Sequence, residues 1–170
     1  MIYISDGTEE EQALARITYL CIAAHQDDIE FMAYAPIAEC FGSKDKWFGA
    51  IIVTDGAGSP RSGLYADYTD EQMKEVRIVE QKKAATVGEY GFLAMLSHPS
   101  REVKDAGNTK IIEELAELIR EAKLYCGLTV TILNAWGACV VGRAIWWRMS
   151  CGVSRSIPIR AFWKRFRDWR

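Results

Sequence analysis

The sequence predicts a single α/β domain with a largely parallel sheet, and two observations lead to that prediction. Apolar runs bounded by polar residues or glycine occur at 17–25, 46–56, 91–99 and 124–133, and each has the length of a buried strand. Segments with helical spacing or helix-start residues lie between them. Buried strands that alternate with helices are typical of layered folds in which helices cover parallel strands. A length of 170 residues suits one such domain.

The first strand, ITYLCIAAH at 17–25, is followed by the segment IEFMAYAPIAECF at 29–41. This segment is apolar nearly all round and ends at Gly42, so we expect a short buried helix in which Pro36 occupies an early turn or causes a kink. The second strand, at 46–56, leads into a loop at 57–68 that is rich in Gly, Ser and Pro and long enough to be functional.

A longer helix begins after the start signal TDEQ at 69–72. The Thr69 hydroxyl can accept from the free amide groups of the first turn, while Asp70 and Glu71 face the positive end of the helix dipole. We expect this helix to end near Gly88. Its apolar side is marked by Met73, Val76 and Val79.

The third strand, GFLAMLSHP at 91–99, is closed by Pro99, and Asn108 or Thr109 caps the next helix. Apolar residues repeat at helical spacing along that helix, at Ile111, Ile112, Leu115, Leu118 and Ile119. The run LYCGLTVTIL at 124–133 completes the sheet as a fourth strand.

Composition limits the class of protein. No apolar run reaches the ~20 residues of a membrane-spanning helix, and the acidic start MIYISDGTEEEQ has no signal-peptide pattern. The five cysteines, at positions 21, 40, 126, 139 and 151, are odd in number and show no CxxC spacing. This favours reduced thiols and a cytoplasmic protein.

Polar residues end three of the predicted strands. They are found at positions 25–28, at Thr54 with Asp55, and at Ser97 with His98. Ligands of parallel sheets bind beyond the carboxyl ends of the strands, so these residues are expected to converge on a binding site.

The stretch His25, Gln26, Asp27, Asp28 has two interpretations. Paired aspartates before a helix commonly cap and complement its N-terminus. An imidazole and a carboxylate three residues apart can also bind one divalent ion such as Zn²⁺. In that case His25 and Asp28 are the ligands, and Asp27 is free to hold a water molecule and take its proton. A third hypothesis is a phosphoacceptor receiver-like signalling domain with Asp55 as acceptor, although the adjacent His and the Pro/Gly-rich loop fit it poorly.

Several motifs, in the same order, resemble the LmbE-like, or PIG-L, N-deacetylases. AHQDDIE resembles their [A/P]HPDDE signature, and VTDGAGS resembles their strand-then-TDG loop. Their R-x2-E-x3-A-x2-LG helix is matched by Arg77, Glu80, Ala84, Val87 and Gly88, and LSHPSREVKDAGN resembles the region that follows. The resemblance covers roughly residues 15–123.

The resemblance implies a Rossmann-like three-layer sandwich and a zinc-dependent hydrolase, with Zn²⁺ or another divalent metal as cofactor. The substrate would be a small N-acetylglucosamine-type sugar conjugate, and no nucleic-acid partner is expected. By that resemblance His25 and Asp28 bind the metal, Asp27 is the general base and Arg77 contacts the substrate. The spacing alone also allows Arg77 to be a solvated helix residue that pairs with Glu80.

The chain departs from the family pattern at three points. Gln26 replaces the usual Pro, and Ile29 precedes Glu30 where the motif has Glu directly. More seriously, the family takes its third metal ligand from an HxxH-like segment after the fourth strand, and this chain has no histidine beyond His98. We interpret His98 as a loop residue, with lining of the site as the alternative.

The C-terminal part differs in composition. Residues 1–124 carry 13 Lys/Arg and 22 Asp/Glu, whereas residues 125–170 carry 8 and 1 and hold five of the six tryptophans. We therefore divide the chain into a deacetylase-like core at 1–124 and an atypical tail at 125–170, so that the fold is incomplete at its C-terminus. Our hypothesis is a tail read out of frame. The alternative is a basic, aromatic segment that binds anionic membrane or nucleic acid. The sequence thus predicts an impaired metal-dependent deacetylase, with an inactive family remnant as the alternative.

Overall fold

The computed structural model describes residues 1–105, 107–122 and 129–133. Within them lies a five-stranded sheet in the order β1-β4-β3-β2-β5. Its strands are β1 (Ile2–Tyr3), β2 (Tyr19–Ala23), β3 (Phe48–Thr54), β4 (Phe92–His98) and β5 (Thr129–Leu133). The helices are α1 (Glu10–Ala15), α2 (Asp28–Met32), α3 (Tyr34–Cys40), α4 (Asp70–Val87), α5 (Ser100–Val103) and α6 (Lys110–Glu121), with a 3₁₀ turn at Gly63–Tyr65.

The sheet is mostly parallel, as the sequence predicts. β2 pairs in parallel with β3 on one side and β5 on the other, and β3 pairs in parallel with β4. Only the short strand β1, among the described residues, runs antiparallel, along the outer edge of β4. Counted along the chain, the four parallel strands lie in the order 3-2-1-4. The order reverses at β2, since the chain adds two strands on one side and then returns to the other.

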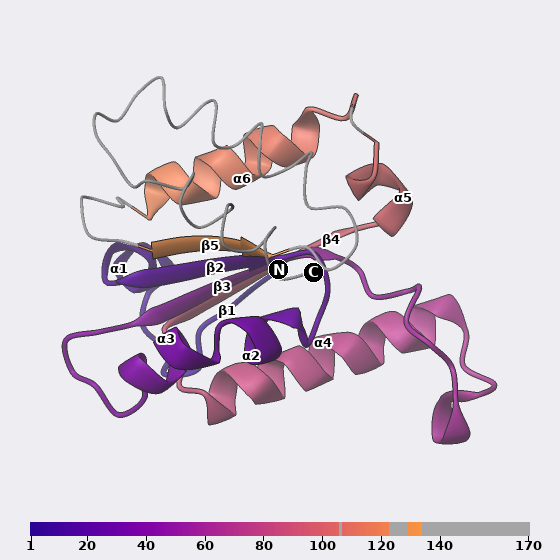
Figure 1. Ribbon diagram of the computed structural model, residues 1–170, viewed down its shortest axis with the longest axis horizontal. Coiled ribbons are helices and arrows are strands. Elements are labelled where there is room, and N and C mark those ends of the chain that lie inside the picture. Colours follow the sequence, from indigo (N-terminus) through magenta and orange to yellow (C-terminus); the bar gives the residue numbers. More distant parts are fainter. Residues whose placement is uncertain (106, 123–128, 134–170) are drawn as a thin grey trace, which may run out of the picture.

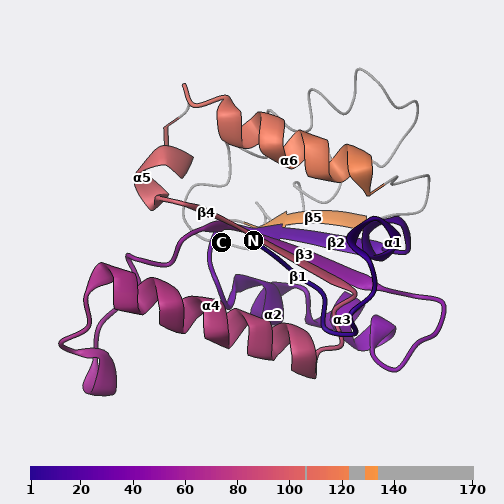
Figure 2. The same cartoon turned by 180° about the vertical axis from the view of Figure 1, so that it is seen from behind.

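Helices cover both faces of the sheet (Figure 1). α6 and α1 lie on one face and α2, α3 and α4 on the other, and the reverse view shows the same two groups (Figure 2). All seven residues of β3 are buried. Alternate residues of the strands therefore form two cores. One core joins Ile22, Ile51 and Phe92 to Leu115 of α6, and the other joins Cys21, Ala50, Ile52 and Leu93 to Ile29 of α2.

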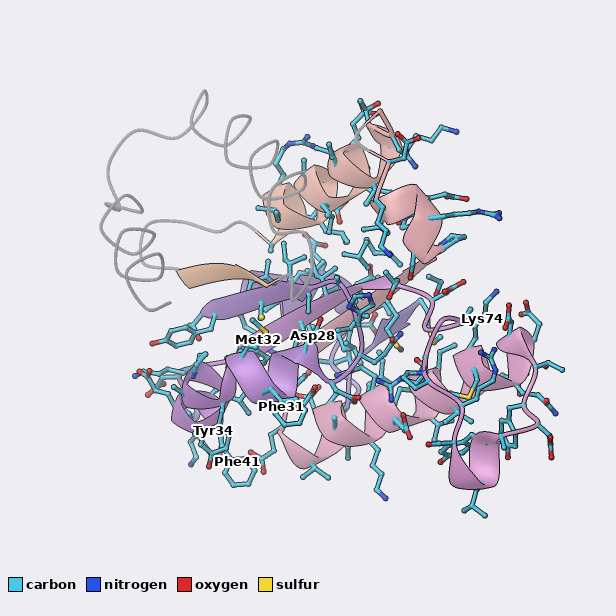
Figure 3. All side chains as sticks on the ribbon, turned by 45° about the vertical axis from the view of Figure 1, so that its right-hand side comes forward. Asp28, Phe31, Met32, Tyr34, Phe41 and Lys74 are labelled. Carbon is cyan, nitrogen blue, oxygen red and sulfur yellow. The ribbon has the colours of Figure 1, made fainter. Side chains whose placement is uncertain are left out.

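The predicted buried helix at 29–41 is two helices, and the prediction of full burial is wrong. α2 ends at Met32 and α3 begins at Tyr34, with Ala33 at φ −114° between them. Pro36 has no N–H to donate to the carbonyl of Met32, one turn earlier, so the break precedes the proline. Ile29 is buried, but Phe31 and Tyr34 are 84% and 71% exposed. Figure 3 shows these two residues on the same stretch of chain as Asp28.

The start of α4 is as predicted, and its apolar side differs. Thr69 accepts from the backbone N–H of Gln72 at 3.3 Å, and the Gln72 side chain accepts from the N–H of Thr69 at 2.9 Å, which completes a capping box. Met73 is buried, whereas Val79 is 65% exposed, so its assignment to the apolar side is wrong. The helix is buried instead at Met73, Gln81 and Ala85, and one of these three is polar.

The helix α6 and its start are close to the prediction. Ile111, Leu115 and Ile119 are buried. Of the two predicted caps, the Asn108 side chain accepts from the N–H of Lys110 at 3.2 Å, while Thr109 makes no side-chain capping bond. β1, α1 and α5 are short elements that the sequence patterns did not predict. In the described part of the chain no helix has the length and apolar character needed to cross a membrane.

The predicted fourth strand is described only in its second half, as β5. Residues 124–128 and the tail from 134 onward lie outside the described residues, as do Cys126, Cys139 and Cys151. β5 itself lies beyond the predicted core boundary at 124 and pairs with β2 along its whole length, from Tyr19 with Thr129 to Ala23 with Leu133.

Candidate metal and base site at the end of β2

The three polar strand ends do converge, as expected. The backbone N–H of Thr54 donates to the carbonyl of Ala24 at 2.9 Å, and the N–H of Asp55 donates to the carbonyl of His98 at 3.0 Å. The ends of β2, β3 and β4 are therefore joined to one another. Because β2 is also the strand at which the sheet order reverses, residues 25–28 emerge at the place where doubly wound sheets bind ligands.

His25 and Asp28 lie together at this point. Asp28 is the first residue of α2, and its Oδ2 lies 3.3 Å from the Nδ1 of His25. The same oxygen accepts from the backbone N–H of His25 at 3.2 Å. The His25 side chain is 43% exposed and that of Asp28 is 19% exposed. A ring nitrogen and a carboxylate oxygen thus point at one another from a partly open surface.

Asp27 points elsewhere, toward α4. Its Oδ2 lies 2.6 Å from Nη2 of Arg77, whose Nη1 lies 2.5 Å from Oε2 of Glu80. The pairing of Arg77 with Glu80 that spacing alone suggests is therefore present, and Arg77 also contacts Asp27. Burial works against the charge on Arg77, but the carboxylates of Asp27 and Glu80 raise its pKa overall. The guanidinium stays charged beside a carboxylate that is 57% exposed.

The backbone at Asp27 adopts an uncommon conformation. Its φ is +75°, in the left-handed region that non-glycine residues rarely occupy. Asp27 is the residue before α2, yet its side chain makes no capping hydrogen bond. The capping interpretation of Asp27 is therefore wrong, because its carboxylate is directed to Arg77 instead.

Gln26 and Gly56 allow α4 to come close to the site. Gln26, at the position of the family's Pro, is 4% exposed and donates from Nε2 to the carbonyl of Thr54 at 3.1 Å. Gly56 has φ +77°, and a Cβ at this position would lie 2.8 Å from Cγ of Arg77 and 3.0 Å from Oε1 of Gln26. Both the conformation and the space at this position require glycine.

Asp55 belongs to the neighbouring loop. It is 8% exposed, its Oδ1 accepts from the N–H of Ala57 at 3.1 Å, and its Oδ2 lies 3.3 Å from Nζ of Lys74. Lys74 lies toward the N-terminal end of α4 (Figure 3). Both oxygens of Asp55 are therefore engaged in holding the loop and the helix in place.

No third metal ligand accompanies the pair of His25 and Asp28 in residues 1–105 and 107–122, where no group of three His, Cys, Asp or Glu side chains could hold a metal ion. The Nε2 of His98 contacts Oε2 of Glu114 on α6 at 2.5 Å. Cys21 is buried, and burial together with the charges of Glu30 and Asp28 raises the pKa of its thiol to about 12. It is therefore a protonated core residue and a poor metal ligand.

A buried polar group that the sequence patterns did not predict lies behind Asp27. Gln81, 1% exposed, accepts at Oε1 from the backbone N–H of Asp27 at 3.3 Å and donates from Nε2 to Oε1 of Glu30 at 2.8 Å. The Tyr90 hydroxyl donates to the same Glu30 oxygen at 2.8 Å. Burial and the adjacent Glu30 raise the pKa of Tyr90, so its hydroxyl keeps the proton that it donates.

The comparison with protein families agrees with the geometry. The family described as PIG-L, GlcNAc-PI de-N-acetylase, matches residues 20–135. The match includes the stretch from His25 to Asp28, the Arg77 helix and the whole of β5, and it ends two residues after Leu133, the last residue of β5. No curated protein matches the chain significantly. The family match covers more than half of the sequence, and the chain therefore belongs to the PIG-L family of de-N-acetylases.

Proposed function

We propose that the chain is a divalent-metal-dependent hydrolase that removes the acetyl group from a small N-acetylglucosamine-type sugar conjugate. The observation that supports this most directly is the arrangement at the end of β2 in a chain of this family. There the pair of His25 and Asp28 lies next to Asp27, which is held 2.6 Å from Arg77. The order of the parallel strands, 3-2-1-4, supports the Rossmann-like fold that we expect for such an enzyme.

The donor atoms of His25 and Asp28 suit a zinc ion. Two ligand atoms of a tetrahedral zinc site, each about 2.0–2.1 Å from the metal, lie roughly 3.3 Å apart. The Nδ1 of His25 and the Oδ2 of Asp28 are 3.3 Å apart, so their separation suits one ion, which would replace their present contact with each other. A catalytic zinc site normally has three protein ligands, and the described residues supply two. We therefore expect weak metal binding and an impaired enzyme.

The proposed reaction is the hydrolysis of an amide. His25 and Asp28 would hold the metal, which would supply Lewis-acid polarisation of the acetyl carbonyl and would make water a better nucleophile. Asp27 takes a proton from the attacking water as it bonds to the carbonyl carbon. The carbon–nitrogen bond then breaks, and Asp27 returns the proton to the departing amine. Arg77 holds the Asp27 carboxylate in place, and we propose that it also contacts the substrate.

The strand order also distinguishes between the alternatives. Receiver-like signalling domains have the order 2-1-3-4-5, whereas the parallel strands of this chain follow 3-2-1-4. Asp55, the residue that a phosphoacceptor would require, has both oxygens engaged by Ala57 and Lys74. The structure thus favours the deacetylase over the receiver-like alternative. An inactive family remnant is the second candidate, because two ligands hold zinc less well than three.

Acetate release tests the proposed function. The full chain, incubated with an N-acetylglucosaminide and excess zinc, is expected to release acetate slowly, and a chelator is expected to stop the release. Glu75→Gln, an exposed change on α4, serves as a control that keeps the activity. Zinc-loaded protein that releases no acetate would contradict the enzyme and favour the inactive remnant.

The missing third ligand leads to a further prediction, about the gene. β5 runs parallel to β2 and ends at Leu133, paired with Ala23, so its carboxyl end lies at the same edge of the sheet as the end of β2 that His25 follows. We expect another reading frame after about codon 123 to encode an HxxH-like segment. The nucleotide sequence of codons 120–170, translated in all frames, decides this. If no frame encodes such a segment, the out-of-frame hypothesis is wrong and the basic tail is genuine.

A further inference from the structure

A chain of hydrogen bonds connects the backbone of Asp27 to the far end of α4. The Asp27 N–H donates to Gln81 Oε1, Gln81 Nε2 donates to Glu30 Oε1, and the Tyr90 hydroxyl donates to that same oxygen. Gln81 and Tyr90 are 1% and 2% exposed. These polar groups are therefore shielded from water, and each depends on its neighbours for hydrogen bonds.

The chemistry of the groups at either end fixes the orientation of the Gln81 amide. A backbone N–H can only donate, so the Asp27 amide needs an acceptor. The amide oxygen of Gln81 must therefore face Asp27 and its NH₂ group must face Glu30. Glu30 depends on Oε1 alone, because its Oε2 is buried without a hydrogen-bond partner. Glu30 and Tyr90 thus orient Gln81, and Gln81 in turn holds Asp27.

The held group is a backbone amide at a strained position. A non-glycine residue in the left-handed region persists only where the surrounding structure holds it there. At φ +75° the Asp27 side chain leaves the turn toward α4, where its Oδ2 meets Arg77 at 2.6 Å. If the backbone relaxed to negative φ, the direction of the side chain would change and the carboxylate would leave Arg77. Gln81 is the buried side chain that contacts the Asp27 amide directly.

We propose that Gln81 is a positioning residue, which fixes the left-handed backbone of Asp27 and so directs its carboxylate to Arg77 and the reacting water. Glu30 and Tyr90 set the orientation of the Gln81 amide. The catalytic part of this inference rests on the proposed function, which gives Asp27 its role. The physical link between Gln81 and the Asp27 amide does not depend on that function.

Amide hydrogen exchange of the full chain, without substrate, tests that link. Gln81→Met keeps the length of the side chain and removes both hydrogen bonds. We expect exchange at the Asp27 amide to become about tenfold faster, while the Ala85 amide, in the same helix, is unchanged. Glu75→Gln is the matched control and leaves both rates as they are. If the exchange rates of the Asp27 and Ala85 amides rise by the same factor, or if neither rate rises, the positioning role is wrong.

A second test swaps the hydrogen-bond donor and acceptor between positions 81 and 30. The variants used for it have side chains of nearly unchanged shape. Gln81→Glu places a carboxylate against Glu30 and is expected to release the Asp27 amide. Glu30→Gln alone can keep its oxygen at the Oε1 position and is expected to be mild. The double variant gives position 30 an NH₂ group that can donate to the new carboxylate and to the Tyr90 oxygen. We expect it to restore slow exchange at Asp27. Failure of this rescue would overturn the proposal.

Activity measured on the same variants separates the two proposals. If the chain hydrolyses its substrate, Gln81→Glu is expected to lower kcat with little change in KM, and the double variant is expected to recover kcat. If the native chain is inactive, the proposed function fails, and the exchange result still decides whether Gln81 holds Asp27. Recovery of exchange without recovery of kcat in an active chain would contradict the catalytic part of the inference.

Discussion

Asp27→Asn is expected to lower the rate of acetate release by about 10²–10⁴-fold and to leave zinc bound. This range is the usual contribution of a general base, and an amide cannot take the proton of the attacking water. The substitution is otherwise conservative at this position. Asn tolerates the left-handed backbone better than most residues, and its side-chain oxygen can still accept from Arg77. A loss of rate therefore reports on the proton and not on the fold.

The measurement pairs turnover with metal content. Acetate is assayed with saturating zinc, and bound zinc is determined on the same preparation after unbound metal has been removed. Glu75→Gln, which neutralises an exposed carboxylate on the same helix as Arg77, controls for a general effect of charge. Full turnover by Asp27→Asn would show that the base is another group. Loss of zinc would show that Asp27 is a ligand.

The parallel sheet could be predicted because its signal is local. Buried strands such as β3 are apolar throughout, and polar residues mark their ends. The short elements β1, α1 and α5 were missed because two to six residues carry too little periodicity. The break at Ala33 has a cause that the sequence shows, Pro36, whereas the exposure of Val79 depends on what packs against α4. The sequence of a helix does not by itself determine which of its faces packs against the rest of the protein.

The candidate site also has one part that the sequence indicates and another part that only the fold reveals. His25, Asp27 and Asp28 are neighbours in the sequence, so their types and spacing indicated a metal site before any fold was known. Gln81 lies 54 residues from Asp27, and in sequence it is one more polar residue of a polar helix. Its role depends on α4 crossing behind the β2–α2 turn, which only the fold reveals. The lack of a further histidine after the fourth strand, where the family pattern has one, could be seen in the sequence, which has two histidines in total.

Arg77 shows a further limit of predictions that are based on the spacing of residues in the sequence. Its pairing with Glu80, three residues on, follows from helix geometry and is present at 2.5 Å. The contact with Asp27, 50 residues away, does not follow from spacing. Together these contacts leave a mostly buried guanidinium between two carboxylates, at the point where the proposed base is held. Arg77 therefore makes the pair that the local pattern suggests, but it is mostly buried and not solvated, and it is also a partner of the site.

His25→Ala and Asp28→Ala are each expected to weaken zinc binding by more than about 100-fold, above the 10–100-fold that loss of an outer hydrogen-bond partner costs. The effect is large because two protein ligands are already fewer than a catalytic zinc site normally has. Titration of zinc into metal-free protein, followed by calorimetry or by competition with a chromophoric chelator, measures the change.

The other histidine supplies the matched control for that titration. His98→Ala removes the same kind of side chain from the end of β4, two strands from β2, and breaks its contact with Glu114. If the metal lies between His25 and Asp28, this variant keeps the native affinity. If His98 lines the site after all, its loss weakens binding as much as that of His25. Equal affinity in the native protein and in His25→Ala would remove the end of β2 as the metal site, and with it the proposed reaction.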